Sequence, residues 1–286
     1  MTPFSIAGLQ LSLASGDNRD RIEHAIADAV RRFPWVQMVV LPELASFGAS
    51  LASAESLPGP TERRYCALAS KLDVWIVPGS IYERHEGRIY NTASVIDPTG
   101  RVVGRYRKIF PFLPYETGVS PGSQVLVFDV PEVGRFGVSI CYDQWFPEVT
   151  RAMVWHGAEV IVHPTLTGTI DRAQELVLAQ SNAIVNQCYF VDINHAGALG
   201  NGRSIVVGPD GDVVHQAGEQ NEVVAFTVDL DRVRHSRSHG IKGLGQMLKS
   251  FRDTPVEFAC YAKGAPAASP SLQDLGPLTM SRRAGR

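Results

Sequence analysis

The feature that most constrains the fold is an alternation of short apolar runs of β type with stretches whose apolar residues recur at helical spacing. In residues 18–33, for example, Ile22, Ile26 and Ala29 fall on one face of a helix. The first half of the chain is predicted to contain strands at 4–13, 35–43 and 74–83 and helices at 18–33 and 61–71. The second half is predicted to contain strands at 134–141, 158–165 and 188–197 and helices at 146–157 and 171–187. This order predicts an α/β protein in which helices cover the outer faces of two sheets.

Two hairpin sequences suggest that the chain has two similar halves. Residues 88–108 contain the turn "DPTG", and residues 204–216 contain "GPDG". Proline presets the φ angle of such a turn, and glycine supplies a positive φ. The two hairpins are separated by about a hundred residues, as expected if the chain uses one plan twice.

Length and charge restrict the kind of partner. The chain has 286 residues, 44% of them hydrophobic, so it can bury a sizeable core. Its 27 Lys and Arg residues nearly balance its 29 Asp and Glu residues, without a long run of either sign. This balance argues against nucleic acid or an anionic membrane and favours a small molecule. The start of the chain lacks the basic region of a signal peptide, and no run approaches the roughly 18 apolar residues of a membrane span.

The cysteines and histidines indicate neither a disulfide scaffold nor a metal site. The four cysteines, Cys66, Cys141, Cys188 and Cys260, are sparse and show no CxxC spacing. The eight histidines show no spacing typical of zinc ligands. We therefore expect a protein of the reducing cytoplasm without a metal or other cofactor.

Three predicted strands end in side chains that can react. Glu43 ends the strand at 35–43, Lys108 ends the first hairpin, and Cys141 ends the strand at 134–141. In α/β sheets, ligands bind beyond the carboxyl ends of strands, so an acid, an amine and a thiol could converge on one pocket. Taken singly, each has a simpler interpretation as a solvated loop residue, a surface charge or a small buried apolar residue. The spacing alone leaves these alternatives open.

The sequence around these residues resembles the nitrilase superfamily of carbon–nitrogen hydrolases. The segments "LPELASFG", "YRKIFPFLPYETGVSPG" and "GVSICYDQWFPEVTRAMVWHGAEVIVHPT" occur in the order of that family, and the resemblance extends over about 4–230. It implies a four-layer αββα sandwich. It also implies a Glu-Lys-Cys triad in which Cys141 is the nucleophile, Glu43 the general base and Lys108 the electrostatic stabiliser. Glu116 matches a second glutamate that orients the site in this family.

The resemblance implies hydrolysis of a non-peptide amide through a cysteine thioester, with release of ammonia and a carboxylate. Tyr142 and Asp143 follow the cysteine, which is similar to the amidase and carbamoylase branches, whereas nitrilases commonly have Trp and Glu there. An N-carbamoyl substrate stays open as the alternative. A nitrilase, a thiol-dependent acyltransferase and a non-catalytic binding protein are further alternatives. His163 and His195 lie in apolar strand contexts, and we expect them to be structural.

Four residues near these motifs are candidates to contact the substrate. They are Tyr115, Tyr142, Trp145 and Thr165. For each of them, packing beside the site is an equally good interpretation.

The sequence also leads us to expect one domain, a C-terminal tail and a homo-oligomer. Residues 1–253 are expected to form a single carbon–nitrogen hydrolase domain, and 254–286, rich in Ala, Pro, Ser and Gly, a C-terminal tail or dimer arm. Family members generally pair through their outer helices. The helix at 146–157 carries Val149, Met153, Val154 and Trp155, which we expect to contribute to a homodimer or larger homo-oligomer. The alternative is that these residues pack on their own sheet and that the tail is disordered.

Overall fold

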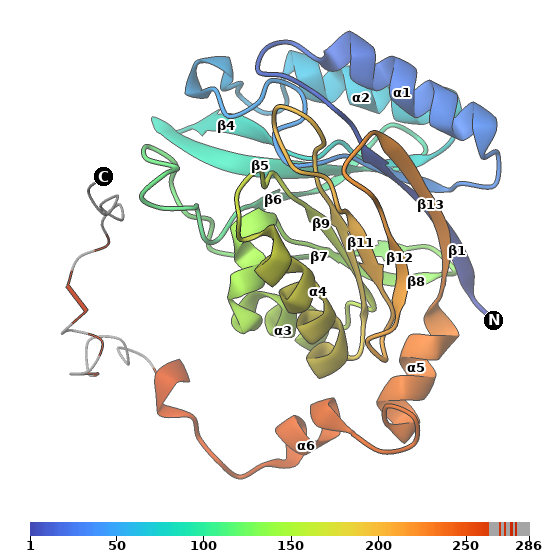
Figure 1. Ribbon diagram of the computed structural model, residues 1–286, viewed down its shortest axis with the longest axis vertical. Coiled ribbons are helices and arrows are strands. Elements are labelled where there is room, and N and C mark those ends of the chain that lie inside the picture. The colour runs from blue at the N-terminus through green and yellow to red at the C-terminus, as the bar shows by residue number, and fades with distance from the viewer. Residues whose placement is uncertain (263–268, 270–271, 273–274, 277, 279–286) are drawn as a thin grey trace.

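The computed structural model describes residues 1–262, 269, 272, 275–276 and 278, and it contains two β-sheets packed face to face (Figure 1). The first sheet consists of β1 (Pro3–Gln10), β2 (Met38–Val40), β3 (Trp75–Val77), β4 (Ile81–His85), β5 (Arg88–Ile96), β6 (Val102–Arg107) and β13 (Glu222–Asp229). The second consists of β7 (Leu126–Val130), β8 (Gly134–Val138), β9 (Val160–Pro164), β10 (Tyr189–Ile193), β11 (Ile205–Val207) and β12 (Val213–Gln216).

The strand orders are β13-β1-β2-β3-β5-β4, with β6 beside β5, and β12-β11-β10-β9-β8-β7. Parallel pairs form the centre of each sheet, β1-β2-β3 in the first and β8-β9-β10 in the second. The helices of the described chain are α1 (Arg19–Arg32), α2 (Pro60–Leu72), α3 (Pro147–Trp155), α4 (Arg172–Asn186), α5 (Leu230–His239) and α6 (Met247–Asp253). The 3₁₀ turns are η1 (Leu51–Ser53), η2 (Cys141–Trp145) and η3 (Ala259–Tyr261).

Alternate side chains of the central strands supply two different cores, because successive residues of a strand point to opposite faces. In β2, Val40 packs between the sheets, whereas Val39 packs under the outer helices. Across the sheet interface, Phe4 meets Phe136 edge to face, with 5.3 Å between ring centroids. The first sheet is covered by α1 and α2, and the second by α3 and α4. This arrangement confirms the predicted αββα sandwich.

Several strands are shorter than predicted, and their ends have identifiable causes. In the first sheet, β2 covers only part of the predicted 35–43, and Pro42 follows it without an N–H to donate to a neighbouring strand. In the second sheet, β8 ends at Val138, and the Asp143 carboxylate accepts the N–H of Ile140 at 2.9 Å. That bond turns the chain, so Cys141 begins a 3₁₀ turn instead of ending a strand.

The outer helices correct part of the expectation about assembly. Val149, Met153 and Val154 of α3 are only 3%, 0% and 5% exposed because they pack on their own sheet. Their assignment to a subunit interface was therefore wrong. Trp155 differs, because it is 57% exposed at the end of the helix.

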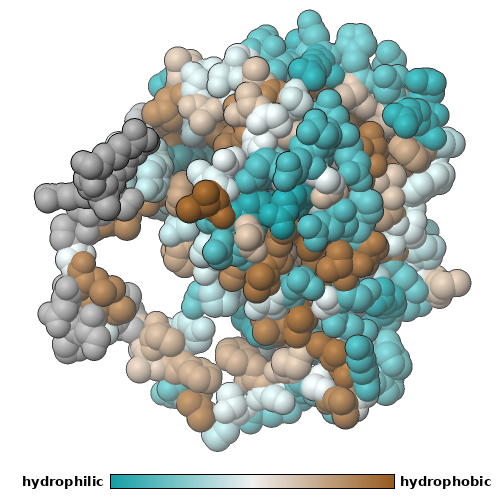
Figure 2. All heavy atoms as spheres, viewed as in Figure 1, coloured by the Kyte–Doolittle hydropathy of each residue, from teal (hydrophilic) through white to brown (hydrophobic). Residues whose placement is uncertain are grey.

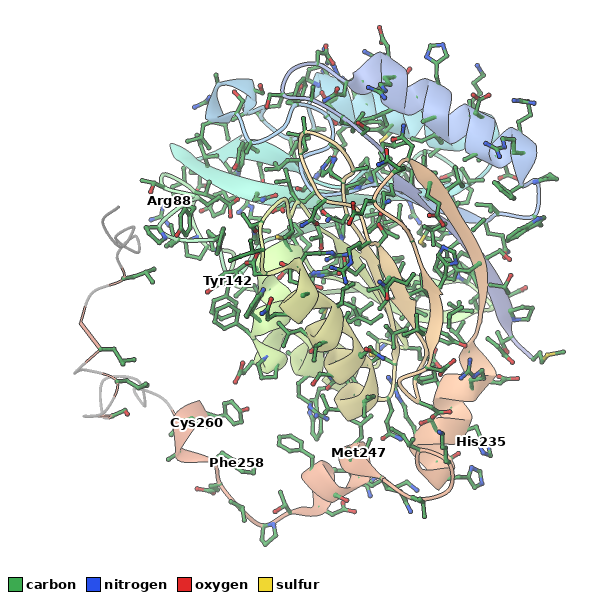
Figure 3. The ribbon with its side chains drawn as sticks, in the orientation of Figure 1. Arg88, Tyr142, His235, Met247, Phe258 and Cys260 are labelled. Carbon is green, nitrogen blue, oxygen red and sulfur yellow. The ribbon has the colours of Figure 1, made fainter. Side chains whose placement is uncertain are left out.

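The C-terminal part of the described chain leaves the sandwich after α5. From 255 to 262 the chain is exposed and forms an arm from which Phe258 and Cys260 project (Figure 3), and the Tyr261 hydroxyl lies 3.4 Å from the Glu148 carboxylate of α3. Much of the predicted tail at 254–286 lies outside the described residues. Within the described part of the chain, no helix combines the length and the apolar character needed to cross a membrane.

Candidate active site

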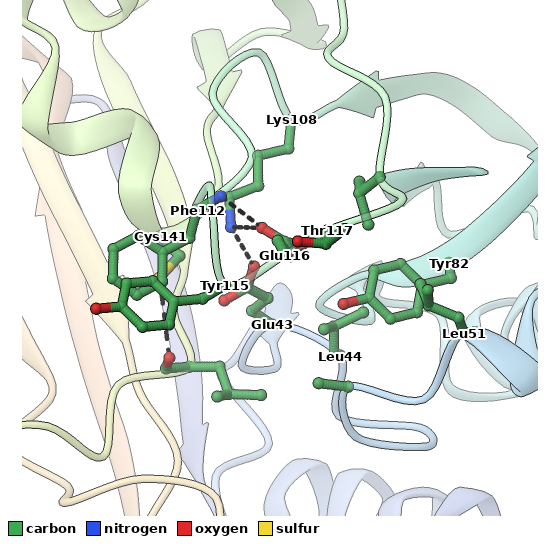
Figure 4. A pocket seen from close by; sticks show the side chains of 13 residues that line it. Glu43, Leu44, Leu51, Tyr82, Lys108, Phe112, Tyr115, Glu116, Thr117 and Cys141 are labelled. Carbon is green, nitrogen blue, oxygen red and sulfur yellow. Dashed lines mark hydrogen bonds and ion pairs between the residues drawn. The ribbon is translucent and has the colours of Figure 1, made fainter. Parts of the chain in front are cut away.

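One pocket of about 280 Å³ collects the three side chains that sequence analysis placed at strand ends. Glu43 lies after β2, Lys108 after β6 and Cys141 after β8, so both sheets contribute to the site (Figure 4). The lining residues are Glu43, Leu44, Ala49, Leu51, Tyr82, Lys108, Phe112, Tyr115, Glu116, Thr117, Val119, Cys141 and Leu166. The pocket therefore combines an apolar and aromatic wall with one thiol, one amine and two carboxyl groups.

Lys108 is the centre of a buried polar cluster with Glu43, Glu116 and Asn91, here called the lysine cluster. Its ammonium nitrogen lies 2.8 Å from Glu43 Oε1 and 2.9 Å from Glu116 Oε2. The Asn91 amide donates to the same two side chains, at 2.7 Å to Glu43 Oε1 and 2.9 Å to Glu116 Oε1. Because Asn91 is fully buried on β5, it fixes the separation of the two carboxyl groups.

The protonation of the lysine cluster follows from burial and mutual charge. Burial raises the pKa of Glu43 above its usual range, and Glu116 adds to this rise while Lys108 opposes it. Burial disfavours the Lys108 ammonium, but Glu43 and Glu116 outweigh it and raise the lysine pKa well above its ordinary value. Burial also acts against the Glu116 carboxylate, yet Lys108 holds its pKa below the usual value. Glu43 is thus the member of the cluster best suited to exchange a proton.

Cys141 is held in a left-handed backbone conformation, with φ of 47°, at the first residue of η2. Asp143 secures this turn: its carboxylate accepts the N–H of Ile140 and the Tyr106 hydroxyl, at 2.9 and 2.7 Å. It also accepts the N–H of Phe110 at 2.9 Å, which links the thiol turn to the segment that follows Lys108. The strained backbone of Cys141 is therefore held in place by bonds from Asp143 both to its own turn and to the segment around Lys108.

The Cys141 thiol is neutral in this environment. Burial raises its pKa well above the ordinary value, and Glu43 adds to the rise while Lys108 opposes it. The sulfur lies 3.9 Å from both the Leu166 carbonyl oxygen and the Thr167 hydroxyl. A neutral thiol beside a carboxyl group with a raised pKa can pass its proton to that group, and a neighbouring ammonium can then meet negative charge on a bound oxygen.

The two buried histidines contribute hydrogen bonds to the framework of the site. His195 Nε2 lies 2.6 Å from the Glu43 carbonyl oxygen, and His163 Nδ1 lies 2.7 Å from the Ser139 hydroxyl. Burial lowers the pKa of each histidine to about 4, so both are neutral at pH 7. These contacts agree with the structural role expected for them.

The predicted substrate contacts fall in different places. Tyr115 lines the pocket, where its ring stacks on Phe112 at 4.8 Å between centroids. Tyr142 and Trp145 pack next to the site, and Thr165 is fully buried behind it; none of the three belongs to the pocket wall.

Sequence reasoning missed several side chains of the site, because nothing in their local pattern separates them from ordinary core residues. Asn91 sits in the middle of a strand sequence, and Tyr82 lies on another strand. Leu44, Phe112, Thr117 and Val119 fall inside the quoted motifs, where the sequence does not indicate which side chains face a pocket. The missed wall residues are Leu44, Ala49, Leu51, Tyr82, Phe112, Thr117, Val119 and Leu166. Across the described residues, no group of three or more His, Cys, Asp or Glu side chains is placed to hold a metal ion.

Comparison with known proteins places this geometry in context. The family model described as carbon-nitrogen hydrolase matches residues 6–238. The omega-amidase NIT2 of Homo sapiens is 30% identical over 258 residues, which cover 83% of this chain and 92% of the human protein. The omega-amidase NIT2 of Danio rerio is 30% identical over 252 residues, covering 80% of this chain and 90% of that protein.

The fold is also similar to solved structures of nitrilase-superfamily proteins. The crystal structure of Saccharomyces cerevisiae Nit3, a member of branch 10 of the nitrilase superfamily, has a TM-score of 0.76 at 29% identity and covers 83% of this chain and 94% of its own. A mutant of the amidase from Nesterenkonia sp. AN1 in complex with butyramide has a TM-score of 0.73 at 25% identity, covering 82% of this chain and 94% of that chain.

Proposed function

The chain belongs to the carbon–nitrogen hydrolase family and is an amidohydrolase, and from this premise we propose that it hydrolyses small, uncharged carboxamides through a thioester on Cys141. The observation that carries the proposal is the convergence of the neutral Cys141 thiol and the lysine cluster on one pocket. Glu43, Lys108 and Cys141 are the proposed catalytic residues.

The first half of the reaction forms the acyl-enzyme. Glu43 accepts the Cys141 proton, and the sulfur attacks the amide carbonyl carbon. The carbonyl oxygen gains negative charge, which the Lys108 ammonium and the backbone N–H of Tyr142 stabilise; one such donor contributes about 3–4 kcal/mol to the barrier reduction. Glu43 then returns the proton to the departing nitrogen, the carbon–nitrogen bond breaks, and ammonia leaves.

The second half releases the acid. Glu43 takes a proton from water, and the resulting hydroxide attacks the thioester carbon. The carbon–sulfur bond breaks, the sulfur regains a proton from Glu43, and the product leaves as a carboxylic acid that ionises in water. Glu116 orients Lys108 during both halves, because its carboxylate holds the ammonium beside Glu43.

The composition of the pocket favours an uncharged acyl group. Among the described residues that line it, the charged groups are Lys108 and the carboxyl groups of Glu43 and Glu116, and the lysine is already bound to both. A carboxylate on the substrate would meet two acids without an unpaired cation. The remaining wall is apolar or aromatic, and a volume of about 280 Å³ suits a short chain. An N-carbamoyl compound, whose ureido group is more polar, is the second candidate.

Ammonia release tests the proposed substrate class. Butyramide is expected to turn over, and its analogue with a terminal carboxylate, succinamic acid, to react at least about tenfold more slowly, because like charges meet in the pocket. Cys141→Ala is expected to abolish release, while Cys188→Ala, another fully buried cysteine, retains most of it. Release only when an acceptor amine is added would indicate an acyltransferase. A silent panel that includes N-carbamoyl compounds would contradict the proposal.

We also propose a homodimer that uses the exposed end of α3 and the C-terminal arm. Trp155 contacts Phe251 of α6 edge to face at 5.8 Å, and Arg151 lies over the Phe251 ring. Phe258 and Tyr261 continue this aromatic surface, and both are more than two-fifths exposed. Figure 2 shows hydrophobic residues exposed in the lower part of the molecule, where Figure 1 places α6. Light scattering should give about twice the chain mass of 31.2 kDa, and Trp155→Glu should weaken the assembly. A mass of one chain at micromolar concentration would contradict this proposal.

We propose residues 1–253 as one domain and the cytoplasm as its compartment. Leu230 and Val233 of α5 pack into the core between the sheets, so the domain includes at least this helix. All four cysteines are free thiols, which fits a reducing compartment. Limited proteolysis that removes only residues after 253 would support this boundary.

A further inference from the structure

A second buried ionic cluster lies behind Cys141 and has no part in the proposed reaction. It consists of Arg172 and Glu175 on α4 and Asp192 on β10, here called the arginine cluster. Arg172 is 1% exposed, and its guanidinium lies 3.1 Å from Glu175 Oε2 and 2.8 Å from Asp192 Oδ2. A second guanidinium nitrogen donates to the Arg203 carbonyl oxygen at 2.9 Å. Apolar side chains at these positions would avoid the cost of removing three charges from water.

Thr167 connects this cluster to the thiol. Its hydroxyl donates to Glu175 Oε1 at 3.0 Å and lies 3.9 Å from the Cys141 sulfur. Its main chain is fixed by Asn194, which accepts the Thr167 N–H at 2.9 Å and donates to the Thr167 carbonyl oxygen at 3.0 Å. The hydroxyl therefore has a defined position between a carboxyl group and the sulfur.

A hydroxyl has one proton to donate and two lone pairs to accept with. While Glu175 holds the Thr167 proton, the hydroxyl oxygen can only accept, and the neighbouring donor is the Cys141 S–H. The charged groups that face Glu175 are Arg172 on its own helix and Asp192 on β10, and the titratable thiol of Cys141 on η2 faces it through Thr167. Burial, opposed by Arg172 and assisted by Asp192, raises the pKa of Glu175 to about 7.

We propose that Thr167 and Glu175 are positioning residues that, together with the Leu166 carbonyl oxygen, hold the Cys141 thiol in its protonated form, with the S–H directed at the Thr167 and Leu166 oxygens, until Glu43 takes the proton. The inference rests on Cys141 being the nucleophile of the proposed function. It gives the arginine cluster a role in the site, because Arg172 and Asp192 keep Glu175 in place and Glu175 keeps the threonine proton away from the sulfur.

Alkylation of Cys141 by iodoacetamide, followed peptide by peptide with mass spectrometry, tests the proposal without using turnover. Glu175→Gln removes the charge that holds the threonine proton, so the thiol pKa should fall. A fall of about one unit gives about tenfold more thiolate below the pKa. Because a less basic thiolate is also a weaker nucleophile, the expected gain in rate is about threefold. The pH profile of alkylation should move to lower pH.

Thr167→Val tests the link itself. It removes the hydroxyl at nearly constant volume and should shift the profile in the same direction, while Thr167→Ser should restore the wild-type profile. In the Thr167→Val background, Glu175→Gln should have little further effect, because the connection is gone. Thr167 is therefore a test that remains if Glu175→Gln fails to fold.

Two matched controls separate positioning from stability. Glu62→Gln changes a buried glutamate that also binds an arginine, Arg105, at 2.7 Å and a hydroxyl, Ser94, at 2.6 Å, but on α2. Thr150→Val changes a threonine that is 1% exposed on α3. Neither should move the alkylation profile. An unchanged profile in folded Thr167→Val or Glu175→Gln protein would overturn the proposal, as would a full Glu175→Gln effect in the Thr167→Val background. Loss of turnover in Cys141→Ala is a separate result, so failure of the proposed function is distinguishable.

Discussion

The two buried ionic clusters have the same charges but different surroundings. Each combines one cation with two acidic side chains: Lys108 with Glu43 and Glu116, and Arg172 with Glu175 and Asp192. The lysine cluster borders the pocket that contains Cys141, whereas the arginine cluster lies between α4 and β10 and does not line that pocket.

The type of cation accounts for the difference. An ammonium has three N–H donors, and Lys108 directs two of them at carboxyl groups, which leaves one for a ligand oxygen. The Arg172 guanidinium is planar and binds Glu175, Asp192 and a main-chain carbonyl at once. Lys108, with a free N–H beside the pocket, can therefore bind a reacting oxygen. Arg172, whose N–H groups bind the surrounding acids and a main-chain carbonyl, instead fixes the framework behind the pocket.

The largest expected effect comes from the lysine cluster. Lys108→Met removes the charge that meets the oxyanion, and Glu43→Gln removes the proton acceptor; each should lower kcat by about 10²–10³-fold or more. Initial rates of ammonia release measure this. Lys71→Met, which removes an exposed lysine in the last turn of α2, is the control and should leave kcat within about twofold. A comparable loss of kcat in the control variant would show that the effect is not specific to the lysine cluster.

A smaller effect is expected from Glu116→Gln. The variant keeps the shape of the side chain but loses the charge that holds Lys108 beside Glu43. We expect kcat to fall about 10- to 100-fold with KM nearly unchanged, since Glu116 acts through the lysine. Steady-state kinetics with butyramide provide the measurement. A rise in KM at constant kcat would show instead that Glu116 binds substrate.

The sequence was most informative where chemistry and strand ends coincide. Glu43, Lys108 and Cys141 each stand at the end of a predicted strand, which made one shared pocket possible, and the resemblance of the surrounding motifs to a known family then assigned their roles. Both sheets were predicted from the alternation of β-type and helical segments. Arg172 and Glu175 could not be placed near the site, because polar residues in the first turn of a helix are usually solvated. Their burial depends on how β10 and the loop before α4 pack against them, which the sequence around the two residues does not reveal. The same reason hid Asn91, a polar residue inside a strand.

The smallest effect concerns the pH dependence of stability, which should have opposite signs for Glu175 of the arginine cluster and Glu116 of the lysine cluster. Glu175 has a pKa of about 7 in the folded protein against an ordinary value of 4.5, so it destabilises the fold as pH rises from 4.5 to 7. Glu116 has a lowered pKa, so its contribution is present above 4.5 and is lost as pH falls through the lowered value.

Thermal unfolding across this range measures the contrast. Relative to wild type, Glu175→Gln should gain a few degrees in Tm between pH 4.5 and 7, whereas Glu116→Gln should lose stability relative to wild type toward neutral pH. Tm shifts of the same sign in both variants would show that Glu175 and Glu116 do not contribute opposite pH dependences to stability.

The central claim is that Cys141 carries the acyl group, and intact-protein mass spectrometry with a slowly reacting amide tests it most directly. After rapid acid quenching, wild-type protein should gain the mass of one acyl group, and peptide mapping should place it on Cys141. The adduct should be absent from Cys141→Ala. It should accumulate in Glu43→Gln if this substitution slows deacylation more than it slows acylation. An adduct on a serine, or turnover at the wild-type rate by Cys141→Ala, would contradict the account.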